Sequence, residues 1–133
     1  MNDYVDAVTN IIMTFQWIEE ALKNYIIEAN KKIRERVEDI IPFRYSYEWV
    51  SKDALGKLVD KFSKINSNKA LIKNLVDLTT ERNKMVHRSF LLTIEDKKNN
   101  YQKFGDIKSL RFLNCKLHDV LQQIGEETEK ICS

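Results

Sequence analysis

The sequence has few residues that interrupt regular structure. Its 133 residues include only three Gly and one Pro, whereas an all-β domain needs turn residues about every 8 to 12 positions. Hydrophobic residues make up 43% of the chain and charged residues 32%, a balance that excludes disordered and collagen-like chains. The length is below the roughly 150 residues usual for one domain. We therefore expect residues 1–133 to form a single all-α domain.

Cysteine and long apolar runs are scarce as well. Cys115 and Cys132 have neither a paired metal spacing nor a disulfide framework around them. No apolar run approaches the roughly 18 residues of a membrane span, and Asn2, Asp3 and Asp6 are atypical of a signal or transit peptide. Phosphate-binding Gly loops and nucleophile elbows are absent from the sequence. We expect a cytoplasmic protein with no membrane contact, metal or other cofactor.

Apolar residues recur every three or four positions in four stretches, which is the spacing of an α-helical stripe. The first helix should end before Pro42, because Pro lacks an N–H and disfavours the helical region for its predecessor. An aromatic-rich connection should follow, then a short helix with Ser51 as its N-cap. The expected helices cover 3–37, 51–65, 69–90 and a last stretch capped by Asp106, with a turn and cap at 66–68 and a solvated loop near 91–105. An antiparallel four-helix bundle would pack these helices most economically.

The first helix carries a second apolar edge, formed by Met13, Trp17 and Ala21 at intervals of four. Such an edge either meets a partner chain or is covered by a neighbouring loop.

Charged residues are distributed unevenly along the chain. Residues 1–81 carry 12 basic and 13 acidic side chains, residues 82–116 carry 9 and 3, and residues 117–133 carry 1 and 4. The basic middle block is either a surface that attracts a polyanion or a solvated face.

The helix over 69–90 carries polar residues where a buried face is expected. Its main apolar face is predicted to consist of Ile72, Leu75, Val76, Thr79, Val86 and Phe90. Arg82, Asn83 and His87 fall inside that arc, where an unpaired charge or amide would cost several kcal/mol. They must be satisfied inside the bundle, or the arc must open onto a cleft or subunit interface. His118, by contrast, lies among ordinary surface residues and is given no role.

The segment Arg82-Asn83-Lys84-Met85-Val86-His87 resembles the Arg-x(4–6)-His signature, often with Asn after Arg, of the HEPN superfamily of helical domains. The resemblance covers nearly the whole chain, since a bare HEPN domain has this length and carries the motif at the end of its third helix. It implies a metal-independent endoribonuclease, in which two motifs meet across a homodimer to form a composite active site on RNA. The alternative for His87 is a satisfied core histidine near a helix C-terminus.

The residue types suit that chemistry. Neutral His87 could remove a proton from an RNA 2′-hydroxyl, Arg82 could stabilise the phosphorus oxygens, and Asn83 could orient either group. The products would be a 2′,3′-cyclic phosphate and a 5′-hydroxyl. The expected RNA-binding cations are Lys84, Arg88, Lys97, Lys98 and Lys103. An acid on the first helix, Glu19, is predicted to form an ion pair with Arg82.

One departure from the pattern concerns regulation. HEPN toxins partnered with a minimal nucleotidyltransferase carry a modified Tyr two positions after the His, and this chain has Ser89 there. That form of regulation is doubtful, while another antitoxin or regulatory protein remains possible in a toxin–antitoxin, phage-defence or stress setting. The alternative functions are a non-catalytic HEPN-like module that binds a nucleotide, an RNA or a protein, and a helical adaptor with no nucleic-acid role.

Overall fold

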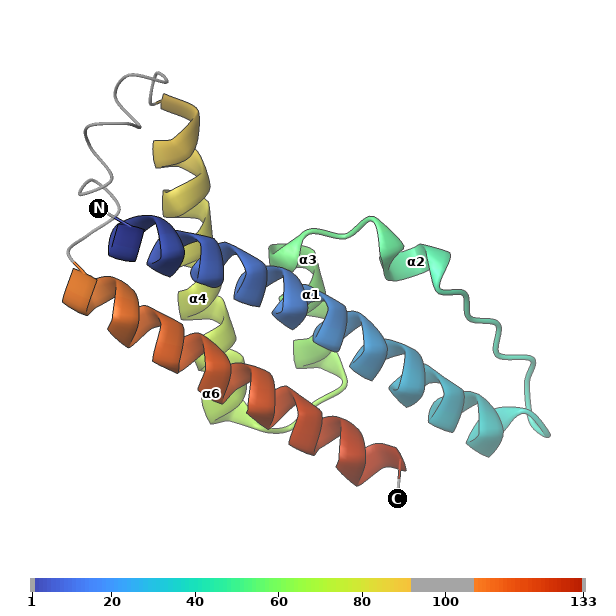
Figure 1. Ribbon diagram of the computed structural model, residues 1–133. Helices are drawn as coiled ribbons and strands as arrows, with labels where there is room; N and C mark the ends of the chain where they lie inside the picture. The colour runs from blue at the N-terminus through green and yellow to red at the C-terminus, as the bar shows by residue number, and fades with distance from the viewer. Residues whose placement is uncertain (1, 92–106, 133) are drawn as a thin grey trace.

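The protein is all-helical over the residues that the structure describes. This computed structural model describes residues 2–91 and 107–132, apart from the side chains at 2–4 and 86–91. Its helices are α1 (Asn2–Val37), α2 (Glu48–Ser51), α3 (Leu55–Lys64), α4 (Lys69–Leu91) and α6 (Ile107–Cys132) (Figure 1). The all-α prediction is confirmed for these ranges. The expected loop near 91–105 and the Asp106 cap lie mostly outside the described residues.

Helix α1 forms the longest part of the core. Its bounds agree with the predicted 3–37 to within a residue at the N-terminus. One stripe is buried along most of its length, at spacings of three and four, and consists of Val8, Ile11, Phe15, Ile18, Leu22, Tyr25, Ile26 and Ala29. Burying a side chain of this size contributes about 1.5–3 kcal/mol. The stripe therefore supplies the surface against which the other helices pack.

Helices α1 and α6 lie side by side and run in the same direction (Figure 1). The C-terminal end of α6 meets α1 before the last turns of α1, where the Cys132 thiol lies 3.8 Å from a Glu28 carboxylate oxygen. Helices α3 and α4 form an antiparallel hairpin, and α4 runs steeply across α1 in the view of Figure 1. A simple up-and-down bundle would instead place its first and last helices antiparallel, so the predicted bundle arrangement is not confirmed.

The predicted helix over 51–65 is divided in two. Ser51 is the last residue of α2 rather than an N-cap, and α3 begins only at Leu55 after Ala54. The Lys23 amine donates to the Ser51 carbonyl oxygen at 3.1 Å, and the Lys61 amine donates to the Trp49 carbonyl oxygen at 2.8 Å. These bonds come from neighbouring helices and hold carbonyl groups at the end of α2. The Ser51 prediction was wrong because tertiary contacts, rather than the capping preference, set this boundary.

A polar network joins the turn between α3 and α4 to the two long helices. The Tyr25 hydroxyl donates to the Ile65 carbonyl oxygen at 2.9 Å, and the Asn66 amide donates to the Tyr25 hydroxyl at 3.1 Å. The Asn68 side chain accepts the Leu71 backbone N–H at 3.1 Å, so the predicted cap at 66–68 is confirmed. These bonds fix the start of α4 relative to α1.

Glu127 of α6 completes this network from a buried position. The Asn66 amide lies 3.4 Å from its carboxylate, and the Lys130 amine lies 3.0 Å away. Burial by itself would raise the Glu127 pKa, but hydrogen bonds from Lys130, Asn68 and Asn66, together with the Lys130 charge, lower it below its usual value. The folded protein therefore favours the ionised carboxylate.

The buried face of α4 differs from the predicted one. The residues buried against the core are Leu71, Leu75, Leu78 and Met85, whereas Val76 is 52% exposed and Asn83 is exposed. Helix α4 has apolar residues on two adjacent arcs. The way in which α1, α3 and α6 pack around it determines which of the two arcs is buried. The prediction was wrong in placing Val76 at the centre of the buried face and Asn83 inside it.

Replacing Glu127 by Gln should reduce the free energy of unfolding by about 1–3 kcal/mol at pH 7, because a charged acceptor of several buried hydrogen bonds is lost. Since the folded pKa is lowered, the carboxylate's stabilising contribution is complete above the unfolded pKa of about 4.3 and is lost as the pH falls through the lower folded pKa. Urea unfolding at pH 7 and at about pH 2.5, below the ordinary carboxylate range, measures both effects. Glu129→Gln, an exposed neighbour on α6, should change stability little at either pH, and equal losses in the two variants would contradict the assignment.

Truncating the two arcs of α4 tests which one is buried. Leu78→Ala, at a site only 1% exposed, should lower the free energy of unfolding by about 2–5 kcal/mol because it leaves a cavity. Val76→Ala should change it by no more than about 0.5 kcal/mol, as is usual for surface positions. Chemical denaturation of both variants measures the difference, and a larger loss for Val76→Ala would show that the other arc is the buried one.

Candidate functional site

The second half of α4 positions the Arg82–His87 motif. Arg82 lies on the buried arc of the helix, between Leu78 and Met85, and its side chain is 31% exposed. An arginine can occupy such a position when its stem packs on apolar surface and its guanidinium reaches a partner. The sequence therefore correctly identified Arg82 as a cation on a core-facing arc that needs compensation.

The partner of Arg82 is Glu19 of α1, as predicted. A guanidinium nitrogen of Arg82 lies 3.5 Å from a Glu19 carboxylate oxygen, and the Glu19 side chain is 18% exposed. Both groups are partly withdrawn from solvent, so screening by water is weaker than for a surface pair. This ion pair connects α4 to the middle of α1 and directs the arginine toward α1.

Asn83 occupies a different side of α4. Its side chain is exposed, and position 87 follows one turn later on the same side of the helix. His87 and Arg88 belong to α4, but their side chains lie outside the described part of the structure. Since Arg82 is directed to α1, the described residues do not bring Arg82 and Asn83 to a common point.

The predicted RNA-binding cations are only partly described. Lys84 is exposed and lies 3.7 Å from Glu81, its neighbour on the same helix. An exposed pair of this kind contributes about 0–1 kcal/mol and leaves the lysine free to exchange partners. Lys97, Lys98 and Lys103 lie outside the described residues. Of the predicted site residues that the structure describes, only Arg82 and Glu19 are therefore brought into contact.

The second apolar edge of α1 is exposed, but on a different flank from Glu19. Met13 is 42% and Trp17 50% exposed, and Ala21 is half-buried. Two residues on a helix differ by about 200° in direction when they are two positions apart, so Trp17 and Glu19 face opposite sides. A partner that contacts only the Met13 and Trp17 edge would not reach the Arg82–Glu19 pair.

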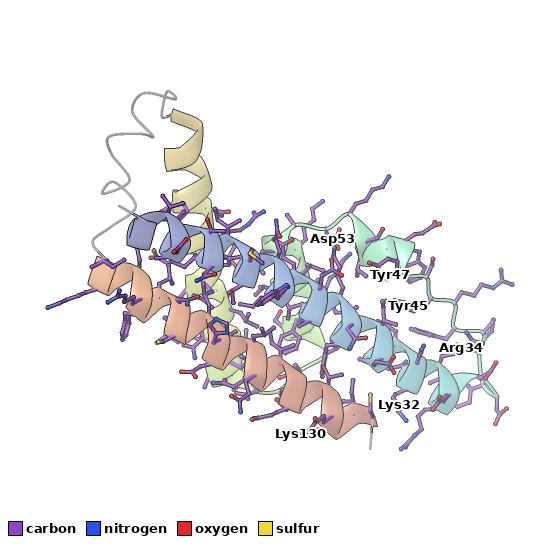
Figure 2. All side chains as sticks on the ribbon, in the orientation of Figure 1. Lys32, Arg34, Tyr45, Tyr47, Asp53 and Lys130 are labelled. Atoms are coloured by element: carbon purple, nitrogen blue, oxygen red, sulfur yellow. The ribbon has the colours of Figure 1, made fainter. Side chains whose placement is uncertain are left out.

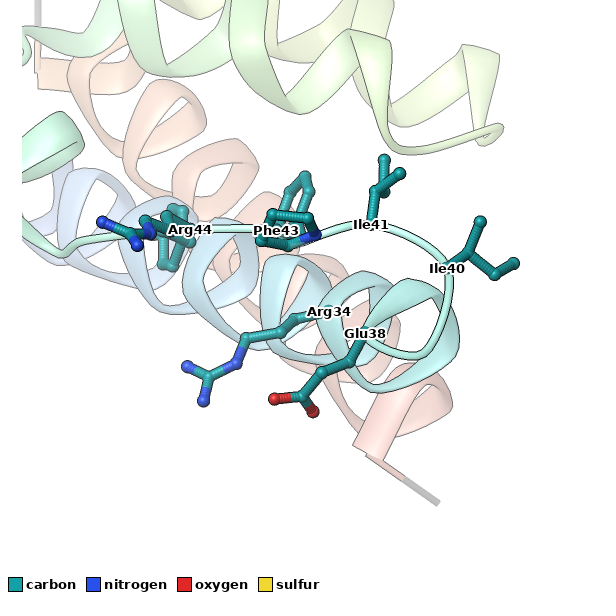
Figure 3. A pocket seen from close by; sticks show the side chains of 8 residues that line it. Arg34, Glu38, Ile40, Ile41, Phe43 and Arg44 are labelled. Carbon is teal, nitrogen blue, oxygen red and sulfur yellow. The ribbon is translucent and has the colours of Figure 1, made fainter.

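Sequence reasoning missed a pocket at the far end of α1. Its lining residues are Arg34, Glu38, Ile40, Ile41, Pro42, Phe43, Arg44 and Tyr45, and its volume is about 600 Å³. Figure 3 shows Arg34 and Glu38 extending from the last turns of α1 and Arg44 standing on the segment that turns back beside them. The aromatic-rich connection and its arginine were the signals in the sequence that could have indicated this pocket.

The chain has no detectable relatives in three comparisons: no family model, no curated protein and no solved structure matches it. Among the side chains that the structure describes, at 5–85 and 107–132, no three of His, Cys, Asp or Glu gather as metal ligands. Among the helices described, none has the length and apolar character needed to cross a bilayer.

The Glu19–Arg82 pair can be measured with a double-mutant cycle. Because both side chains are partly buried, Glu19→Ala and Arg82→Ala should be coupled by about 0.5–1.5 kcal/mol in the free energy of unfolding. The same cycle on the exposed Glu81–Lys84 pair should give no more than about 0.5 kcal/mol. Urea unfolding of all six variants gives both values, and equal coupling energies in the two cycles would contradict a special role for Glu19.

Proposed function

We propose that the protein is a metal-independent endoribonuclease of the HEPN type, with the helices packed as a HEPN-like bundle. The observation that carries this proposal is the position of Arg82 within the Arg82–His87 motif. Its permanently charged side chain lies on a core-facing arc and is held by Glu19 at 3.5 Å. Arg82 lies five residues before His87 on the same helix, which is within the spacing of the motif.

The proposed reaction needs only side chains of this chain and the RNA. Neutral His87 accepts the proton of a ribose 2′-hydroxyl, whose oxygen then attacks the adjacent phosphorus. The P–O5′ bond breaks and the imidazolium formed on His87 returns the proton to the leaving 5′ oxygen, directly or through water, which leaves a 2′,3′-cyclic phosphate on one fragment and a 5′-hydroxyl on the other. Arg82 stabilises the charge on the non-bridging oxygens during this step, and Asn83 orients the histidine or the phosphate.

Helix geometry supports a site shared between two subunits. Positions 82 and 87 differ by about 140° around a helix with 3.6 residues per turn. Arg82 is engaged on the side of α1, whereas Asn83 and position 87 share the other flank. A second copy that contacts the exposed flank of α4 would place its own motif against this one, so a homodimer with a composite site is the form we propose.

The partners that follow are RNA and a regulatory protein. Lys84, Arg88, Lys97, Lys98 and Lys103 would contact the RNA backbone, whose binding depends strongly on salt. Because Ser89 replaces the modified tyrosine of one HEPN toxin group, silencing would require a different antitoxin. We place the protein in the cytoplasm, in a toxin–antitoxin, phage-defence or stress setting.

A non-catalytic HEPN-like binding module is the second candidate. The observation that favours it is again the Glu19–Arg82 pair, since an arginine engaged by a carboxylate can have a purely structural role. In this case Arg82 stabilises the packing of α4 on α1, and the exposed flank of α4 binds a nucleotide, RNA or protein. Cleavage of RNA separates the two candidates.

The purified protein should cleave a labelled single-stranded RNA in EDTA and leave 2′,3′-cyclic phosphate ends. His87→Ala and Arg82→Ala should each reduce the rate by about 10²–10⁴-fold, because each removes a group that acts in the transition state. His118→Ala and Arg111→Ala are matched controls at exposed positions of α6 and should retain full activity. End analysis and initial rates measure the outcome, and an inactive wild type over a panel of RNAs would favour the binding module.

Subunit mixing tests the composite site in the same assay. If each site combines Arg82 of one subunit with His87 of the other, mixing the two inactive variants should restore about a quarter of the wild-type activity, since about half of the dimers are mixed and each contains one intact site. Each variant must first be shown to be folded and dimeric. An active wild type whose variants fail to complement would place both groups of a site in one subunit.

A further inference from the structure

The pocket at the end of α1 lies far from the α4 motif and is independent of the proposed nuclease activity. Residues 38–45 leave α1, turn back at Pro42 and run beside its last turns, and we call this segment the strap (Figures 1 and 3). Figure 2 labels Arg34, Tyr45 and Tyr47 at this end of the molecule. The pocket's volume of about 600 Å³ is within the range of about 300–1,000 Å³ that is typical of ligand sites.

Two arginines of the pocket have no carboxylate partner. Neither Arg34 nor Arg44 forms an ion pair with a described residue. Glu38 is the one acid that lines the pocket, so the lining has a net positive charge. The Tyr45 hydroxyl is buried without a hydrogen-bond partner among the described residues. Burial, with a smaller effect from Tyr47, raises the Tyr45 pKa, so the hydroxyl stays protonated and can donate.

The rest of the surface is apolar and exposed. Ile40 is 79% and Ile41 56% exposed, and Tyr47 and Trp49 continue this surface along the chain toward α2 with about half of their area in solvent. Monomeric proteins seldom expose a continuous run of large apolar side chains without function. A surface rich in aromatic residues and arginine and poor in lysine has the composition of a protein–protein interface.

Contacts fix Tyr45 of the strap and the neighbouring α2 before any partner binds. The Tyr45 and Trp49 rings make an edge-to-face contact with centroids 5.5 Å apart. The Lys61 amine bonds to the Trp49 carbonyl oxygen and forms an ion pair with Asp53, and Lys23 bonds to Ser51. A surface fixed in this way loses little conformational entropy on binding.

We propose that the strap pocket is a docking site for a partner-protein segment that carries a large apolar side chain beside an Asp or Glu. The apolar side chain occupies the hollow among Ile41, Pro42 and Phe43. The neighbouring carboxylate pairs with Arg34 or with Arg44, each of which presents planar donors suited to a carboxylate.

A nucleic acid fits this surface less well. Within the pocket lining itself the exposed large apolar side chains are Ile40 and Ile41, which offer no flat face of the kind on which single-stranded nucleic-acid sites rely. The last carbonyl groups of α1 carry partial negative charge, and Glu38 adds a full one. A single carboxylate at one of the arginines tolerates this environment, but a run of phosphates does not.

The test begins with a random dodecapeptide phage library selected on the full-length protein. Enriched sequences should share a large apolar residue next to an acid. A synthetic, fluorescently labelled copy of the most enriched peptide should bind in a polarisation assay. Its affinity should fall at least tenfold for the Arg34→Glu/Arg44→Glu variant. The matched control is Lys32→Glu/Arg36→Glu, which makes the same charge change on residues of the same region that do not line the pocket and should bind nearly as well.

Four results would overturn the proposal. These are no enrichment, enrichment of basic or purely polar peptides, equal loss of affinity in both double variants, and an unchanged affinity in Arg34→Glu/Arg44→Glu. Light scattering adds a further check, because a dimer that only the pocket variant disrupts would assign the surface to a second copy. Similarly, oligouridine binding lost only in the pocket variant would assign it to RNA. Circular dichroism of each variant confirms that the helices remain folded.

Discussion

Burial of the apolar stripe of α1 is the interaction on which the other elements depend. The stripe runs from Val8 to Ala29 with most of its members inaccessible to solvent. Helix α6 covers it lengthwise and α3 packs across it. No element other than α1 contacts so much of the chain. If a different face of α1 were buried, α6, the α3–α4 hairpin and Arg82 would all occupy different positions.

Charged and polar side chains define how the helices meet on this stripe. Lys23, Glu19 and Glu127 each lie at an edge of the core and bond to a residue distant in the sequence. An unpaired group at these places would be costly, so each one disfavours packings in which its partner is absent. Lys23 bonds to the Ser51 carbonyl and connects α1 to the end of α2. Glu19 pairs with Arg82 and connects α1 to α4. Glu127 bonds to Asn66 and connects α6 to the α3–α4 turn. Burial of the apolar stripe drives the packing of the helices, and these bonds stabilise one arrangement of them over the others.

The two surfaces to which we assign functions lie at different places along α1, one beside its middle and one at its C-terminal end, and they use arginine differently. Arg82 forms an ion pair with Glu19, which directs the guanidinium toward α1 and partly neutralises its charge. Arg34 and Arg44 have no such partner among the described residues and are available to an external carboxylate. If the protein cleaves RNA as we propose, its activity could be controlled by a second protein. A protein-docking surface remote from the cleavage site would allow such a partner to remain bound without occupying the site itself.

Local pattern determined the positions of the long helices, the Asn68 cap and the pairing of Glu19 with Arg82, because each depends on backbone periodicity or on the cost of an unpaired charge. It also identified Met13 and Trp17 as a second apolar edge of α1, which the structure leaves exposed. Tertiary structure alone decided that Leu78 rather than Val76 faces the core, that α1 and α6 run in the same direction, and that the chain breaks between Ser51 and Leu55. Each of these depends on contacts between residues far apart in the sequence. A helical sequence specifies which residues share a face, whereas the neighbours that pack against the helix decide which of two similar faces is buried.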